Sequence, residues 1–147
     1  DIIPGVERKL FDIKGVKIAP LICFEGMSGD PVRELCRMGA QVLVILNSDA
    51  WAAKSPEAAQ HSLTGPFRAV EGRRYLCRAA TTGVSGIYDP YGEPLDTVSV
   101  GSEGVAGATV YPRNKLSLYT IWGDWPLGIL CLVMVVWSLL KLKKSKL

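Results

Sequence analysis

The sequence predicts an α/β domain followed by one membrane-spanning helix. Three observations carry this prediction. Strand-like, helix-like and strand-like runs follow one another over residues 15–47, which is the order of a parallel βαβ unit. Short strand-like runs separated by turn residues come next, and an apolar stretch with lysines behind it closes the sequence. We therefore expect a globular body over residues 1–118 and a helix with a basic tail over residues 119–147.

The first half of the body alternates between strand and helix. Residues 15–24 are short and apolar, as a buried strand would be. Asp30 suits an N-cap and Pro31 suits the first helical position, and Gly39 supplies the end of that helix. The near-continuous aliphatic run 41–47 is typical of a strand that is covered on both faces. These runs predict at least one pair of parallel strands.

The second half of the body begins with a helix and continues with strands. Ser55 and Pro56 open a helix over roughly residues 56–74, and Gly65-Pro66 predicts a kink or break within it. A turn with proline and glycine follows at residues 89–93. The strand-like runs around that turn are residues 75–83, 84–89, 94–100 and 104–112. The order therefore passes from α/β to a β-meander.

The C-terminal segment is apolar and long enough to cross a membrane. Residues 125–142 make eighteen positions, which span about 27 Å as a helix. Trp125 suits a membrane–water interface at one end of the helix, and Lys141 can extend its side chain to the interface at the other end. A buried core helix or an amphipathic helix is the alternative, but no polar face occurs at helical spacing. The lysines predict a cytoplasmic C-terminus and a body on the outer side of the membrane.

Composition excludes several classes of protein. The net charge of +3 arises in the lysine-rich tail, so we expect no nucleic-acid partner. The four cysteines have no zinc-like spacing and His61 is the single histidine, so we expect no metal and no cofactor. A disulfide among Cys23, Cys36 and Cys77 stays open. The sequence starts at Asp1 and its first methionine is Met27, which predicts the C-terminal part of a longer protein.

One cysteine lies where many α/β enzymes expose a nucleophile. Cys23 is followed by Phe24 and Glu25 at the end of the first strand, just before a turn into a helix. A thiolate at such a place needs a base or a positive neighbour to be reactive. The pattern by itself is also compatible with a buried core thiol.

The motifs around this cysteine resemble the carbon–nitrogen hydrolase (nitrilase) superfamily. They are "LICFEG" (21–26), "GAQVLVILNSDAW" (39–51) and the long run from Gln60 to Glu93. Within the superfamily the resemblance is to the apolipoprotein N-acyltransferase family, since it extends over roughly residues 13–140 and includes the final apolar helix. The resemblance implies the C-terminal half of a nitrilase-like αββα sandwich followed by one transmembrane helix.

The resemblance also implies roles for individual residues. Cys23 takes the position of the nucleophile, and Phe24 stands where the family often has tyrosine. Glu25 matches a carboxylate close to the nucleophile, for which the resemblance implies a positioning role, and Arg78 matches the end of a strand beside the site. Asn47, Asp49 and Trp51 match the region that lines the site, whereas His61 is not the general base. The other matched positions are Gln60, Arg68, Ala69, Val70, Glu71 and Gly83.

Purely structural roles remain open for several of these residues. Arg68 and Glu71 also fit a helical ion pair, and Arg78 fits a structural pair. Cys36 and Cys77 are expected to be buried and inert. The sequence departs from the family pattern at Ser48, which is an insertion, and at Thr81, where asparagine is common. These departures bear on the substrate pocket more than on the fold.

The function that the resemblance implies is lipoprotein maturation at the bacterial inner membrane. An acyl chain passes from a phospholipid to Cys23 as a thioester, and then to the N-terminal amine of a diacylglyceryl-cysteine apolipoprotein. The family's catalytic glutamate and lysine lie upstream of the cysteine, so the missing N-terminal portion of the polypeptide is a further expected partner. We expect the 147 residues to be inactive alone. A membrane-tethered amidase or nitrilase, and a non-catalytic truncated or split subunit, are the alternatives.

Overall fold

The computed structural model describes residue 5, residues 7–52 and residues 55–144. Its strands and helices alternate in the first half and run as a meander in the second. The strands are β1 (Phe11–Ile13), β2 (Val16–Ile22), β3 (Val42–Asn47), β4 (Tyr75–Ala80), β5 (Ser85–Tyr88) and β6 (Pro94–Val98). The helices are η1 (Cys23–Met27), α1 (Gly29–Arg37), η2 (Ala50–Ala52), α2 (Glu57–Ser62), α3 (Thr64–Gly72), α4 (Leu118–Trp122) and α5 (Trp125–Lys144), of which η1 and η2 are 3-10 helices.

The six strands form one sheet in the order in which they occur in the chain. The pairs β2–β3 and β3–β4 are parallel, which confirms the predicted βαβ unit. The pairs β4–β5 and β5–β6 are antiparallel, which confirms the predicted meander over residues 75–98. The pair β1–β2 is also antiparallel, and the short strand β1 was not predicted. Because β2, β3 and β4 run in the same direction, the residues that follow their carboxyl ends meet at one edge of the sheet.

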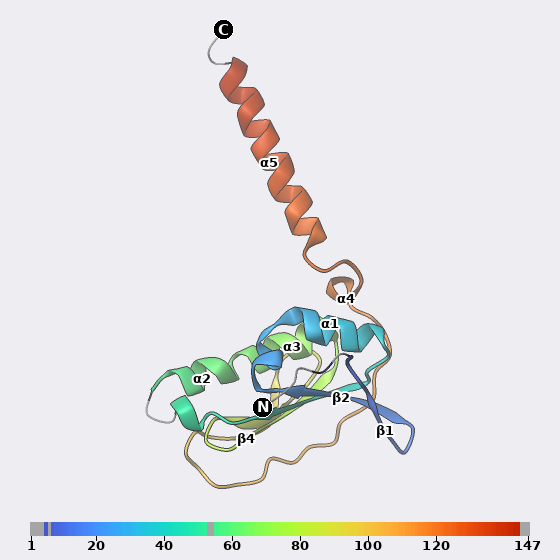
Figure 1. The fold of residues 1–147 in the computed structure, drawn as a ribbon, viewed down its shortest axis with the longest axis vertical. Helices are drawn as coiled ribbons and strands as arrows, with labels where there is room; N and C mark the ends of the chain where they lie inside the picture. The colour runs from blue at the N-terminus through green and yellow to red at the C-terminus, as the bar shows by residue number, and fades with distance from the viewer. Residues whose placement is uncertain (1–4, 6, 53–54, 145–147) are drawn as a thin grey trace.

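The core lies between this sheet and one layer of helices. Figure 1 shows α1 and α3 on the same side of the sheet. Leu21, Leu43 and Leu76 from three adjacent strands pack with Leu35 from α1, and all are almost completely buried. On the other face Leu46 at the end of β3 is 52% exposed. The structure is therefore one sheet with one helix layer, which is one half of an αββα sandwich.

Two local predictions are wrong. The first helix starts at Gly29, with Ser28 rather than Asp30 as its N-cap, because Ser28 keeps an extended backbone (φ −92°, ψ 141°) while Asp30 already lies inside the helix. Residues 104–112 form no strand. The backbone N–H of Gly107 donates to the Asp96 side chain at 2.8 Å, so this segment uses local contacts instead of a ladder.

The predicted break in the second helix is confirmed, slightly earlier than expected. Helices α2 and α3 meet at Leu63, two residues before Gly65. Pro66 therefore lies in the first turn of α3, where its missing N–H leaves no intrahelical bond unmade.

A short helix that the sequence analysis missed joins the body to α5. The side chains of Arg33 and Arg37 on α1 both donate through Nε to the Thr120 carbonyl of α4, at 3.1 and 2.9 Å. Figure 1 shows α5 projecting away from the body. Within α5, residues Trp125–Leu142 have a mean hydropathy of 2.0 and none of this window is buried. Among the described residues, this is the one helix long and apolar enough to cross a membrane.

Candidate active site

Cys23 follows β2 directly and opens the tight turn η1. Its backbone lies in the left-handed region (φ 50°), which residues other than glycine rarely adopt. Such a conformation costs of order 1–3 kcal/mol and persists only where the surrounding structure enforces it. The turn thus holds a half-buried cysteine at the carboxyl edge of the parallel strands, the edge at which ligands bind in open α/β sheets.

Glu25 stabilises the turn that carries Cys23. One carboxylate oxygen (Oε2) accepts a hydrogen bond of 2.8 Å from the backbone N–H of Ile22. The other (Oε1) lies 3.3 Å from Nη1 of Arg8, whose Nε also donates to Glu34 at 2.7 Å. These contacts fit the expected positioning role of Glu25. The contribution of Arg8 was not predicted, because no sequence pattern links a residue seventeen positions upstream to this carboxylate.

Helix α3 is tied to the same turn. Arg68 donates through Nη1 to the Met27 carbonyl at 2.9 Å and through Nη2 to Glu71 at 2.8 Å. The predicted ion pair is confirmed, and the contact with Met27 adds a tether to the turn. Burial raises the pKa of Glu71, although the Arg68 charge opposes that effect. Ala69 is buried in the core and Val70 is exposed, whereas the Arg68 guanidinium bonds to the turn.

A buried polar cluster lies behind the carboxyl ends of β3 and β4. Asp49 is completely buried, and its Oδ2 accepts from Nη2 of Arg78 at 3.0 Å. Its Oδ1 lies 2.7 Å from Nδ1 of His61, and Nδ2 of Asn47 lies 3.4 Å from the same nitrogen. Arg78 therefore makes the structural pair that the sequence allowed, and its role at a catalytic site stays a prediction. The link from Asp49 to His61 was not foreseen.

The pKa of Asp49 follows from this cluster. Burial alone would raise it, but hydrogen bonds from His61 and Asn47 and the charge of Arg78 outweigh burial and hold the pKa below its usual value. A group whose pKa is lower in the folded state adds stability above its unfolded-state pKa, which is about 4. That stability is lost as the pH falls through the folded-state pKa.

We therefore expect the free energy of unfolding to fall between about pH 4 and the lower folded-state pKa of Asp49. Urea unfolding at a series of acidic pH values measures the slope. The Asp49→Asn variant, which cannot titrate, should show a shallower slope over the same range. Equal slopes in the two proteins would show that Asp49 does not supply this dependence.

An aromatic wall stands next to Cys23. The Phe24 ring stacks on Trp51 with 6.4 Å between centroids and lies 5.6 Å from the His61 ring. Phe24 and Trp51 are more than half exposed, whereas His61 is buried. Gln60, the neighbour of His61 on α2, is exposed. The wall offers an open apolar surface beside the cysteine, which suits an acyl chain or another apolar group.

Gly83 lies so close to the Asp49 carboxylate that there is no room for a side chain at this position. A Cβ atom at Gly83 would lie 1.9 Å from Oδ2 of Asp49, the oxygen that pairs with Arg78. Any side chain here must displace that carboxylate.

We expect Gly83→Ala to lower the free energy of unfolding by about 1–3 kcal/mol, since overpacking a closed site costs that much. Chemical denaturation measures it. Gly107→Ala is the matched control, because nothing lies within 4 Å of a Cβ atom there. A Gly83→Ala protein as stable as the control would contradict the close approach.

The described cysteines differ in environment. Burial raises the pKa of Cys36 to about 11 and also raises the pKa of Cys77, so neither suits a nucleophile. Cys131 is exposed on α5. All four cysteines are free thiols. In the described part of the chain no group of His, Cys, Asp and Glu side chains is arranged to hold a metal ion.

The sequence-predicted site residues gather at one edge of the sheet. Cys23, Phe24 and Glu25 lie in the turn after β2, Asn47, Asp49 and Trp51 lie at or after the end of β3, and Arg78 lies in β4. Phe24 contacts Trp51, and Asp49 contacts Arg78. A thiol in a left-handed turn after a parallel strand, and a buried Asp–Arg pair at the ends of the next two strands, give an α/β domain with a candidate nucleophile at the carboxyl edge of its sheet.

The chain belongs to the carbon–nitrogen hydrolase family, whose model matches residues 3–114. It is 32% identical over 140 residues to an apolipoprotein N-acyltransferase of Pseudomonas syringae pv. tomato, covering 95% of this chain and 28% of that protein. It is 37% identical over 121 residues to apolipoprotein N-acyltransferase 1 of Treponema pallidum, covering 82% of this chain and 22% of that protein. The chain thus spans about a quarter of the length of these relatives.

Solved structures show the same fold at low sequence identity. Nit3 of Saccharomyces cerevisiae, a member of the nitrilase superfamily, superposes with a TM-score of 0.60 at 20% identity, over 69% of this chain and 40% of that one. An amidase from Nesterenkonia sp. AN1 superposes with a TM-score of 0.53 at 22% identity, over 67% of this chain and 41% of that one. The sheet and its helix layer therefore have a nitrilase-like fold, as the sequence predicted.

Proposed function

We propose that this chain carries the nucleophile of a phospholipid-dependent N-acyltransferase that matures lipoproteins. The observation that carries the proposal is Cys23, held in a left-handed turn by Glu25 and Arg68 at the carboxyl edge of the sheet. The names of the relatives and the apolar helix α5 support the same reading. In this reading α5 crosses the inner membrane with the C-terminus in the cytoplasm, and the body lies on the outer side.

The proposed reaction has two covalent steps. The Cys23 thiolate attacks an ester carbonyl of the phospholipid, a carbon–sulfur bond forms, and the lysophospholipid leaves as an alkoxide that takes a proton. The N-terminal amine of the apolipoprotein then attacks the thioester, an amide bond forms, the thiolate leaves and the amine loses a proton. The exposed ring of Phe24 and that of Trp51 form the surface along which the acyl chain lies during both steps.

The proton transfers need groups that the 147 residues do not supply in this reading. We propose that a glutamate acts as general base and a lysine stabilises the oxyanion, both from a further N-terminal portion of the polypeptide. The family resemblance does not assign that base to His61, whose buried ring is held by the Asp49 carboxylate at Nδ1.

The acceptor of the acyl group distinguishes this proposal from the amidase alternative, which the amidase neighbours favour. The native protein, extracted from membranes, is incubated with a phospholipid and a peptide bearing a diacylglyceryl-cysteine amine. We expect a hydroxylamine-labile acyl group on the Cys23 peptide and an N-acyl amide as the product, both identified by mass spectrometry. Free fatty acid as the main product would assign the chain to hydrolysis. An unmodified Cys23 would overturn both assignments.

A further inference from the structure

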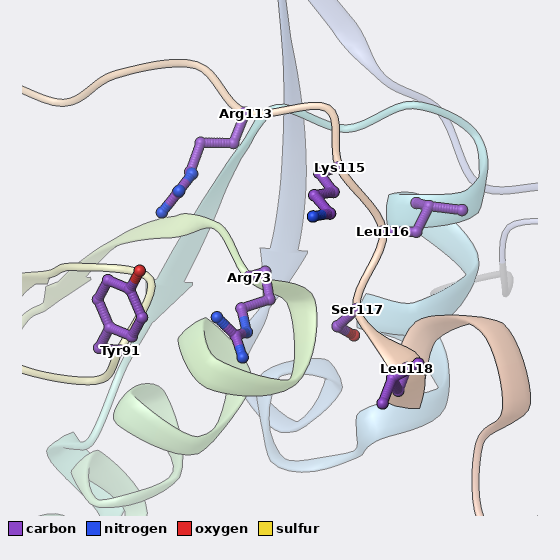
Figure 2. A pocket seen from close by; sticks show the side chains of 7 residues that line it. All are labelled: Arg73, Tyr91, Arg113, Lys115, Leu116, Ser117 and Leu118. Atoms are coloured by element: carbon purple, nitrogen blue, oxygen red, sulfur yellow. The ribbon is translucent and has the colours of Figure 1, made fainter.

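A basic pocket lies between the end of α3 and the segment that leads into α4. It has a volume of about 410 Å³, and Figure 2 shows Arg73, Arg113 and Lys115 around it. None of its lining residues is acidic. Among the described residues, no carboxylate lies within ion-pair distance of any of these three cations.

The pocket is rigidly built. Arg73 takes a left-handed backbone (φ 53°) at the end of α3, and its guanidinium lies 5.5 Å from the centre of the Tyr91 ring. The segment that carries Arg113 and Lys115 is fastened by Arg74, which is completely buried and donates to the Lys115 carbonyl at 2.7 Å. Arg113 is also held through its backbone N–H, which donates to the Gln41 carbonyl at 3.3 Å. The backbone that carries these three cations is thus held around one space, and among the described residues none of the three has a counter-charge.

The charge around the pocket is higher than the three visible cations suggest. A fourth cation, Arg74, lies beside this segment: burial lowers its pKa, the nearby Cys36 opposes that effect, and the charge of Arg113 adds to it. Nη2 of Arg74 has no hydrogen-bond partner in the described structure. An anion in the pocket would relieve this repulsion.

The other wall of the pocket is apolar and adjoins α5. Leu116 and Leu118 line it and are 39% and 72% exposed. The short helix α4 begins at Leu118, and Trp125, the first residue of α5, follows seven residues later. At the far end of α4, an apolar groove is lined by Trp122 and Trp125 together with Arg33. Cations beside exposed leucine and tryptophan at the start of an apolar helix match the phosphate and glycerol region of a membrane.

We propose that the pocket formed by Arg73, Arg113 and Lys115 binds the phosphate of an anionic membrane phospholipid, with Leu116 and Leu118 against its glycerol and first acyl carbons. This lipid is a bound neighbour and not the acyl donor, because the pocket shares none of its lining residues with the Cys23 turn or the aromatic wall. The proposal rests on the membrane placement of α5 and not on acyl transfer.

The test measures which lipid the protein retains. Native protein carrying Cys23→Ala, so that no acyl transfer can occur, is placed in nanodiscs of equal parts phosphatidylglycerol and phosphatidylcholine. Native mass spectrometry then gives the ratio of the two lipids that remain bound. We expect phosphatidylglycerol to be enriched, and the enrichment to fall about fivefold for each cation removed, or on the order of 100-fold for Arg73→Gln/Arg113→Gln/Lys115→Gln.

A matched control and a second variant separate the effect of the pocket on lipid enrichment from the effects of overall charge and of misfolding. Lys9→Gln/Lys14→Gln/Lys17→Gln also removes three positive charges, near the β1–β2 hairpin, and should leave the enrichment unchanged. Arg113→Glu/Lys115→Glu changes only exposed side chains and should abolish it. Unchanged enrichment in both pocket variants would overturn the proposal. Inorganic phosphate that binds the pocket in lipid-free detergent and displaces phosphatidylglycerol at equal concentration would also overturn it, in favour of a free-anion site.

Discussion

Replacing Cys23 by alanine is expected to abolish the covalent acyl-enzyme and to lower turnover by at least about 10⁴-fold. The thiol is the only group of the protein that bonds to the acyl carbon in the proposed reaction, and removal of a covalent nucleophile costs other enzymes this much or more. The fold should survive, since alanine tolerates the Cys23 backbone about as well as cysteine and the contacts of Glu25 and Arg68 do not involve the thiol. Acyl transfer from labelled phospholipid, followed on gels and by mass spectrometry, measures both quantities.

Cys77→Ala is the control for this experiment, because Cys77 lies in β4 and its pKa is raised by burial. It should keep the acyl-enzyme and most of the turnover. An undiminished acyl-enzyme band in Cys23→Ala would remove Cys23 from the mechanism and with it the proposed function.

Replacing Asp49 by alanine is expected to lower the free energy of unfolding by about 3–5 kcal/mol. Asp49 and Arg78 form a completely buried ion pair, and removing one partner leaves the other charge buried without compensation. The His61 ring loses the carboxylate at its Nδ1 at the same time, and Nε2 of that ring has no hydrogen-bond partner in the described structure. Urea denaturation followed by circular dichroism measures the change.

The surface carboxylate Asp30 supplies the comparison for this loss. Asp30 lies in the first turn of α1, and its replacement by alanine should lower the free energy of unfolding by less than about 1 kcal/mol. If Asp49→Ala costs no more than Asp30→Ala, the Asp–Arg pair does not organise the ends of β3 and β4. Asp49→Asn should fall between the two, because it keeps the shape of the side chain and loses its charge.

The sequence was sufficient to predict the elements whose residue types favour a single kind of secondary structure. Aliphatic runs at residues 15–24 and 41–47 became adjacent parallel strands, and the second helix divided at Leu63, three residues before Pro66. The strand-like composition of residues 104–112 led to a wrong prediction of a further strand. β6 occupies the edge of the sheet, and the segment after it bonds back to the Asp96 side chain. Strand propensity describes a side-chain surface and does not ensure a pairing partner.

The site was predicted as a set of residues but not as a set of contacts. The motifs placed Cys23, Asp49 and Arg78 at strand ends, where the parallel sheet brings them to one edge. The bond from Arg68 to the Met27 carbonyl and the pairing of Arg8 with Glu25 depend on tertiary distances that no local pattern encodes. The close approach of Gly83 to Asp49 belongs to the same class, since a glycine in a loop gives no indication of what lies opposite it.

The bond from Arg33 and Arg37 to Thr120 has a mechanical consequence. It fixes α4 on the body, and only Gly123 and Asp124 separate α4 from α5. With the bonds intact, four backbone torsions set the angle between the body and the long helix. If α5 crosses a bilayer as proposed, this two-residue joint keeps the body close to the lipid surface, and the acyl carbon must leave the bilayer to reach Cys23. The enzyme would then extract its donor from the bilayer, and its substrate search would be confined to two dimensions.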